Sequence, residues 1–321
     1  MDKPLWMWAA FFAFVAILLF IDLGVLHRKD REISIKESLL TSGGYILMSL
    51  CFGGWVWYEL GAESGSLFLT GYLVEKTLSL DNIFVMSIIL SYFAIPRDLQ
   101  HRVLFWGIMG VIVLRGVMIG VGAGLVAEFH WVLYIFAAFL MFTGVKMLFM
   151  KDNHDTDIGN NLIVRFINKH MRVTKELHGH DFLVRKPDPK TGKIVTFMTP
   201  LLLALIVIEF VDLIFAVDSI PAIFALTTDP YIIYTSNIFA ILGLRALYFA
   251  LSAVIARFAY MKYALALVLI FIGSKVFIMD IFDIAKFPAS VSLGVTIGLL
   301  AGGVIYSLYK TKDAPPVILN S

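Results

Sequence analysis

Cysteine is almost absent from this chain of 321 residues, which contains only Cys51. A single thiol excludes an internal disulfide, a CxxC zinc cluster and a dithiol redox pair. Charged residues are also scarce, at 16%, whereas 60% of the residues are hydrophobic and the mean hydropathy is +0.86. This composition is far too apolar for one soluble core and predicts a protein that resides in the lipid bilayer, with Cys51 as a small core side chain.

The motifs that mark common enzymes and nucleic-acid-binding proteins are missing as well. GxxxxGK[ST], HExxH and GxSxG do not occur, and no nucleic-acid motif is found. The glycines of GVMIGVGAG are better explained by close helix packing than by phosphate binding. We therefore expect neither an enzyme nor a nucleic-acid partner, and no resident cofactor.

Long apolar runs make up most of the sequence. A spanning helix needs about 20 mostly apolar residues, and helices satisfy their own backbone hydrogen bonds in lipid. We predict an all-α membrane protein of nine transmembrane helices, at 5–26, 41–58, 67–95, 103–127, 131–150, 198–226, 233–256, 263–281 and 288–309.

The distribution of basic residues predicts the orientation. With the N-terminus outside, the cytoplasmic side receives nine lysines and arginines in the loop 151–196 and most of the others. The opposite side keeps only Lys3 and Lys286. Because cytoplasmic loops are enriched in Lys and Arg, the prediction is N-out and C-in, which an odd number of spans requires. The loop itself suggests a short amphipathic helix followed by a hairpin.

An internal repeat relates the third to fifth spans to the sixth to eighth. The offset between matched positions drifts only from 137 to 129 residues. Three spans per copy place the second copy upside down in the bilayer, an architecture common among secondary transporters. The matched features are Glu75-Lys-Thr-Leu-Ser-Leu-Asp81-Asn82 with Asp212-Leu-Ile-Phe-Ala-Val-Asp218-Ser219, Arg115 with Arg245, Gly144 with Gly273 and Lys146 with Lys275.

The repeat divides the chain into five parts. These are a two-helix segment at 1–66, repeat one at 67–150, a cytoplasmic loop at 151–197, the inverted repeat two at 198–281, and a last helix with a cytoplasmic tail at 282–321.

Acidic residues inside the spans need a chemical reason, because a carboxylate in the bilayer centre costs several kcal/mol unless it is paired, hydrated or bound to a cation. A spacing of seven residues nearly returns to one helix face, so Glu75 shares a face with Asn82, and Asp212 with Ser219. Asp81 and Asp218 point elsewhere unless a helix breaks, and Pro221 is the expected place for a break.

Oxygen donors without His or Cys suit Mg²⁺, Ca²⁺ or Mn²⁺. Two alternatives remain open: salt bridges between these acids and buried bases, with Asp81 and Asp218 as natural partners of Arg115 and Arg245, or a proton relay without metal. Asp22, near the cytoplasmic end of the first span, could extend an ion path or snorkel to the membrane surface. The predicted cation ligands are Glu75, Asp81, Asn82, Glu209, Asp212, Asp218 and Ser219.

Three long and distinctive runs, LTGYLVEKTLSLDNIFV, IEFVDLIFAVDSIPAIFALTTDP and SNIFAILGLRALYF, resemble the TerC/Alx family of bacterial integral membrane proteins. The likeness extends from about Asp22 to Lys310. It implies an inner-membrane protein associated with manganese export, metal homeostasis and, in some members, tellurium resistance. It also implies that the acidic motif positions of the family fall on Glu75, Asp81, Glu209, Asp212 and Asp218.

The sequence and the resemblance together lead us to expect export of a divalent metal ion, with Mn²⁺ first, through a site between the repeats and with coupling to protons as an option. The rival hypothesis is a membrane scaffold whose cytoplasmic loop recruits soluble stress-resistance proteins. An exporter of organic cations is a third, and it would need a roomier cavity. The oligomeric state does not follow from the sequence.

Overall fold

The computed structural model of the chain describes residues 3–21, 35–129, 131–149, 173–174, 176–187, 192–251, 258, 260–282 and 287–312. In two helices the description covers the backbone but not the side chains of Ile35, Asp81, Phe84, Val217 and Asp218. The elements are α1 (Leu5–Ile21), α2 (Ile35–Tyr92), α3 (Arg97–Glu128), α4 (Val132–Phe149), β1 (Leu183–Pro187), β2 (Ile194–Met198), α6 (Pro200–Leu226), α7 (Pro230–Ile241), α8 (Leu244–Leu251), α9 (Met261–Ile281) and α10 (Ala289–Lys310).

Helices long and apolar enough to cross a bilayer dominate the described residues. Six segments meet both criteria: α3, α4, α6, the α7–α8 pair, α9 and α10. The chain is therefore a mostly helical, multi-pass membrane protein. Two other described helices overlap predicted spans without meeting these criteria, since α1 has 17 residues and α2 has 58 with an internal break.

Helix α2 consists of two helical arms, 35–60 and 62–92, on either side of Gly61. Gly61 adopts φ 89° and ψ 165°, a conformation open to glycine but strained for other residues. The arms pack closely, because a Cβ at Gly65 would lie 2.7 Å from the Cβ of Trp57. The predicted spans 41–58 and 67–95 thus form one tight helical hairpin.

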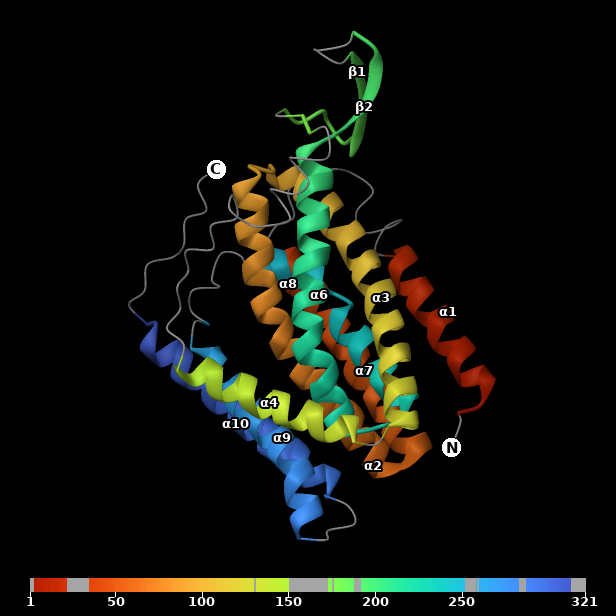
Figure 1. Cartoon of the computed structure of the whole chain (residues 1–321), viewed down its shortest axis with the longest axis vertical. Coiled ribbons are helices and arrows are strands. Elements are labelled where there is room, and N and C mark those ends of the chain that lie inside the picture. The colour runs from red at the N-terminus through yellow and green to blue at the C-terminus, as the bar shows by residue number, and fades with distance from the viewer. Residues whose placement is uncertain are drawn as a thin grey trace.

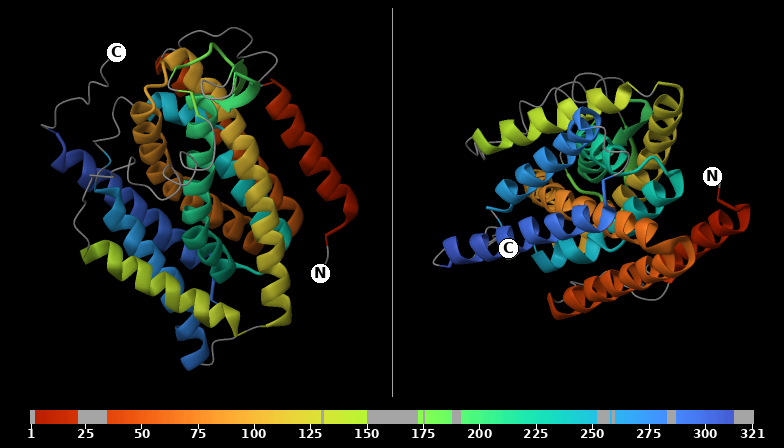
Figure 2. Two further views of the ribbon diagram at one scale, coloured as in Figure 1. Left: turned by 45° about the horizontal axis from the view of Figure 1, so that its top comes forward. Right: turned by 90° about the horizontal axis from the view of Figure 1, so that it is seen from below.

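The helices are arranged in an inner bundle and a crossing group (Figure 1). The arms of α2 pack against α6, α7 and α8, and α3 packs against α6 and α7. Helices α4, α9 and α10 cross this bundle at a steep angle, with α4 against α9 and α6. Figure 2 shows α1 on the outside, beside α2. Trp8 of α1 packs edge-on against Tyr231 of α7, with ring centroids 5.2 Å apart.

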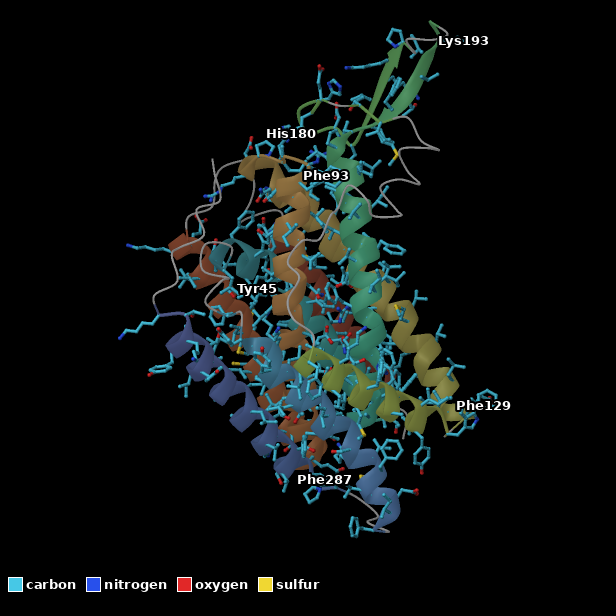
Figure 3. The ribbon with its side chains drawn as sticks, turned by 60° about the vertical axis from the view of Figure 1, so that its left-hand side comes forward. Tyr45, Phe93, Phe129, His180, Lys193 and Phe287 are labelled. Carbon is cyan, nitrogen blue, oxygen red and sulfur yellow. The ribbon has the colours of Figure 1, made fainter. Side chains whose placement is uncertain are left out.

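A β-hairpin precedes α6 and extends beyond one end of the bundle. Strands β1 and β2 pair antiparallel, with Leu183 opposite Met198, so the hairpin expected in the 151–196 loop is confirmed. Lys193, next to its turn, lies at the opposite end of the molecule from Phe287 (Figure 3). The amphipathic helix expected earlier in the loop falls outside the described residues.

Two local expectations are wrong. Helix α6 runs through Pro221 from Pro200 to Leu226, so no break occurs there. The interruption lies instead between α7 and α8, within the single span predicted at 233–256, where Gly243 has φ 79°. Cys51, expected in the core, is exposed.

Candidate functional site

Arg115 stands at the centre of a buried ionic cluster within the helix bundle. It comes from the middle of α3 and is only 1% exposed. Its Nε and Nη2 donate to the two carboxylate oxygens of Asp212 at 3.3 and 3.2 Å. Nη1 donates to Glu75, and it lies 3.3 Å from Ser219 Oγ and from Asn237 Oδ1. The guanidinium therefore bridges the second arm of α2, α6 and α7.

The spacing argument for the two acidic segments is confirmed by this cluster. Asn82, seven residues after Glu75, donates from Nδ2 to Asp212 Oδ1 at 2.9 Å. Ser219, seven residues after Asp212, is a partner of Arg115. The members of each pair thus share one helix face, and both faces contribute to the same ionic cluster.

The charges of the three central groups do not cancel. Two carboxylates and one guanidinium sum to one negative charge when all are ionised. Glu75 and Asp212 are 1% and 2% exposed, so water screens them little. A buried pair of this kind persists because its hydrogen bonds offset the cost of dehydration, and removing one partner is strongly destabilising.

A cavity of about 240 Å³ adjoins the cluster and is lined in part by Arg115. Asn82 also lines it, and the Oδ1 atom of Asn82 is buried without a hydrogen-bond partner among the described residues. The other lining residues are Leu78, Thr143, Lys146, Met147, Phe215, Ser219, Leu265 and Leu269. The cavity is thus polar where it meets the ionic cluster and at Thr143 and Lys146 of α4, and apolar toward α9.

Glu209 lies apart from this hydrogen-bonded network. Both its carboxylate oxygens are buried, and neither has a hydrogen-bond partner among the described residues. The carboxylate packs against α3 at Gly110, where a Cβ would come within 2.3 Å of Oε1. Buried polar groups are nearly always hydrogen-bonded, so this one calls for an explanation.

The break between α7 and α8 is stabilised by Lys76, the neighbour of Glu75. Lys76 Nζ donates to the carbonyl oxygens of Ala240 and Leu242 at 3.0 and 3.5 Å. Carbonyls at a helix end lack intrahelical donors. Lys76 therefore supplies the donor that the interrupted backbone cannot, beside the ionic cluster.

Two predicted ligands, Asp81 and Asp218, have side chains outside the description, as does Asp22. Within the described part of the chain, no group of three or more His, Cys, Asp or Glu side chains lies close enough to hold a metal. The four-carboxylate site thus stays a prediction. The described acidic partners of Arg115 are Glu75 and Asp212, and its expected pairing with Asp81 and Asp218 lies outside the described side chains.

Asn237 of α7 is a member of the cluster that sequence reasoning missed. It is 1% exposed and accepts a hydrogen bond from Arg115. The sequence feature that could have indicated Asn237 is its polar amide within the apolar run SNIFAILGLRALYF, because a buried polar group needs a hydrogen-bond partner. His178, His180 and Asp181 lie in and next to the turn before β1, away from the cluster.

Comparison with known proteins identifies the family. The model of the integral membrane protein TerC family matches residues 60–314. A membrane protein of Rickettsia bellii is 50% identical over 304 residues, covering 94% of this chain and 97% of the relative. A membrane protein of Myxococcus xanthus, STKORF319, is 46% identical over 309 residues, covering 96% and 94%.

A third relative, from Salmonella typhi, has the name "Putative membrane-bound redox modulator Alx". It is 46% identical over 303 residues, covering 92% of this chain and 91% of the relative. No solved structure matches the chain. A family match over most of the chain, together with relatives this similar over nearly their whole length, leads to one conclusion: the chain belongs to the TerC family of integral membrane proteins.

Proposed function

We propose that the chain exports a divalent metal ion, with Mn²⁺ as the first candidate, across the bacterial inner membrane through a site between inverted repeats. The observation that carries the proposal is the meeting of Glu75 and Asp212. They occupy matched positions of the two repeats, and both contact one cation, the guanidinium of Arg115, in the bilayer interior. A place built to hold a positive charge between symmetry-related acids is what a cation transporter requires.

The contact between α4 and α9 supports the inverted repeat. A Cβ at Gly144 would lie 2.7 Å from the carbonyl oxygen of Ala266, and one at Gly273 would lie 2.6 Å from that of Ala137. The offset of 129 residues that relates Gly144 to Gly273 also relates Ala137 to Ala266. Each proposed copy thus makes the contact that the other returns, which supports a two-fold relationship between them.

The oxygen-rich chemistry supports a hard cation. Carboxylates, the Asn82 amide and the Ser219 hydroxyl suit Mn²⁺, Mg²⁺ or Ca²⁺, and Asp81 and Asp218 would complete the set. Glu209, which makes no hydrogen bond to the cluster, is suited to carry the proton in an exchange of metal for protons. Inward movement of a proton on Glu209 would drive outward movement of the metal. Nine spans, N-out and C-in, with relative motion of the repeats, complete the proposal.

The test measures metal uptake into inside-out membrane vesicles, ion by ion and at several pH values, with an organic cation as a further arm. Glu75→Gln and Asp212→Asn should each lower Mn²⁺ uptake at least about tenfold, since each removes a charge from the cation site. Glu59→Gln, at an exposed position of α2, is the matched control. If both cluster variants insert, fold and still transport like the unmodified protein, the site is wrong.

The alternative is a membrane scaffold for stress-resistance proteins, and the protruding β-hairpin gives it a surface to recruit them. The name of the Salmonella relative points to redox modulation, yet a single cysteine leaves this chain without an internal dithiol. Deletion of residues 152–192 separates the two functions. A scaffold would lose its activity, whereas a transporter would keep its metal flux.

A further inference from the structure

The cavity beside the ionic cluster connects that cluster with one end of α4 and one end of α9. Its α4 lining is Thr143, Lys146 and Met147, from the last two turns of the helix. Its α9 lining is Leu265 and Leu269, from the first three turns. Both helix ends adjoin segments that the distribution of basic residues assigns to the cytoplasm. This cavity, which we name the α4 vestibule, therefore leads from the cluster toward the side from which an exported ion must enter.

The α4 vestibule has the room and the oxygen atoms that a hydrated ion needs. Its volume of about 240 Å³ corresponds to roughly eight water molecules. The Oδ1 atom of Asn82 is buried in its lining without a hydrogen-bond partner among the described residues, and Ser219 lines it as well. Amide and hydroxyl oxygens of this kind bind hard cations that keep part of their water. An ion can thus stand beside the cluster before its water is exchanged for carboxylate oxygens.

On the other side of the cluster, toward the helix ends predicted to face outward, α3, α6 and α7 pack tightly. A Cβ at Gly122 of α3 would lie 2.7 Å from Cε2 of Phe224 in α6. The hydroxyl of Tyr234 in α7 donates to the carbonyl oxygen of Gly116 in α3. These contacts hold the three helices together, so the structure matches a state that receives its ion from the cytoplasm.

Lys146 places a positive charge on this route. Its side chain is exposed and forms no ion pair with another described side chain, whereas the charge of Arg115 is held by two carboxylates. A cation in a cavity of low dielectric constant is repelled by a neighbouring ammonium more strongly than in water. At the matched position of the second repeat, Lys275 is 5% exposed and lies 5.9 Å from the centre of the Phe287 ring. The two lysines thus have different surroundings, and it is Lys146 that faces the α4 vestibule.

We propose that the α4 vestibule is the cytoplasmic entrance for the metal ion and that Lys146 sets the metal concentration at which export begins. The ammonium lowers the local concentration of cations in the vestibule, so entry becomes frequent only when the metal is abundant. Such a threshold protects a needed ion from continuous export. The proposal rests on the proposed function and adds the regulation of the same site.

The first test measures access and local charge without any transport step. Cys51→Ala removes the single native thiol, and Thr143→Cys then places one in the vestibule. This thiol should react with small impermeant methanethiosulfonates in inside-out vesicles but not in right-side-out vesicles. Added Lys146→Gln should raise the ratio of the cationic to the anionic reaction rate about tenfold, the lower end for a charged cleft. Lys310→Gln, at the exposed end of α10, should leave the ratio unchanged.

Reaction from the outer side, or from neither side, would overturn the entrance, and an unchanged ratio in Lys146→Gln would overturn the role of its charge. If Lys146→Gln does not fold, Lys146→Met replaces it in both tests.

The second test measures Mn²⁺ uptake into inside-out vesicles over a range of concentrations. Lys146→Gln should lower KM about tenfold and leave the maximal rate nearly unchanged, because the charge opposes entry and not the later steps. Lys146→Arg keeps the charge and should keep the KM of the unmodified protein. Equal KM values in the two variants would contradict the threshold. If the unmodified protein transports no divalent ion, the proposed function fails, whereas the labelling rates still decide whether Lys146 sets the charge of the vestibule.

Discussion

The carboxylate of Glu209 lies directly against the backbone of Gly110. A methyl group at Gly110 would come within 2.3 Å of Oε1 and 2.6 Å of Oε2. Helix α3 thus leaves just enough room for an acid that has no described hydrogen-bond partner. Burial of a polar group without a partner costs about 1–3 kcal/mol, so this acid lowers stability where it stands. A group that is kept at such a cost is a candidate for function.

Replacement of this acid should separate stability from activity. Glu209→Gln removes the charge and keeps the shape, so we expect the thermal unfolding midpoint in detergent to stay or rise. Mn²⁺ uptake into vesicles should fall, and its dependence on the proton gradient should disappear. A lower midpoint with unchanged uptake would mean that Glu209 is a structural residue.

Gly110, which faces Glu209, should be equally sensitive to substitution. In Gly110→Ala the new methyl group must displace the carboxylate of Glu209. The free energy of unfolding should therefore fall by about 1–3 kcal/mol, and Mn²⁺ uptake should fall with it. Gly116→Ala on the same helix is the control, since its Cβ would meet only Tyr234 Cε1 at 3.8 Å. The thermal unfolding midpoints and Mn²⁺ uptake rates of the two glycine variants are the measurements that check this difference. Equal behaviour of both variants would rule out a tight contact at Gly110.

The α4–α9 interface predicts a matched pair of effects. Gly144→Ala and Gly273→Ala each place a methyl group within 2.7 Å of a backbone carbonyl oxygen. Each should lower the stability by about 1–3 kcal/mol, with similar values because the proposed repeat makes the two contacts equivalent. Gly294→Ala on α10, where nothing lies within 4 Å, should not. Clearly unequal effects would speak against the two-fold relationship.

Loss of Lys76 should destabilise the break between α7 and α8 by more than the loss of an exposed lysine would. In Lys76→Met the carbonyls of Ala240 and Leu242 lose their side-chain donor, which should cost about 1–3 kcal/mol. Lys310→Met, at the exposed end of α10, serves as the control for loss of a lysine. Chemical unfolding in mixed micelles provides the measurement. Equal midpoints for both variants would contradict the capping role.

The two acids of the cluster should differ in their effect on stability. Asp212 accepts hydrogen bonds from Asn82 and from two nitrogens of Arg115, whereas Glu75 accepts from one nitrogen of Arg115. Removing a partner of a buried ion pair costs about 3–5 kcal/mol, so Asp212→Asn should approach that range and Glu75→Gln should fall below it. Thermal unfolding of both variants gives the order, and the reverse order would be inconsistent with this hydrogen-bond network.

Several features of the protein follow from the sequence by itself. Apolar runs predicted membrane helices because lipid excludes unpaired backbone groups. Helical periodicity placed Glu75 with Asn82, and Asp212 with Ser219, on common faces, and the cluster confirms both pairs. These features depend on neighbours within one turn or two of one helix, where geometry is nearly constant.

Other features were decided by the tertiary structure. Local chemistry suggested a break at Pro221, but α6 continues through it, and the interruption occurs at Gly243. Arg115 pairs with Glu75 and Asp212, and Asn237 joins them, because α2, α3, α6 and α7 converge at that depth. Which charges meet depends on the rotation and depth of several helices at once. The periodicity of a single helix carries no information about its neighbours, so only their packing could select the partners of Arg115.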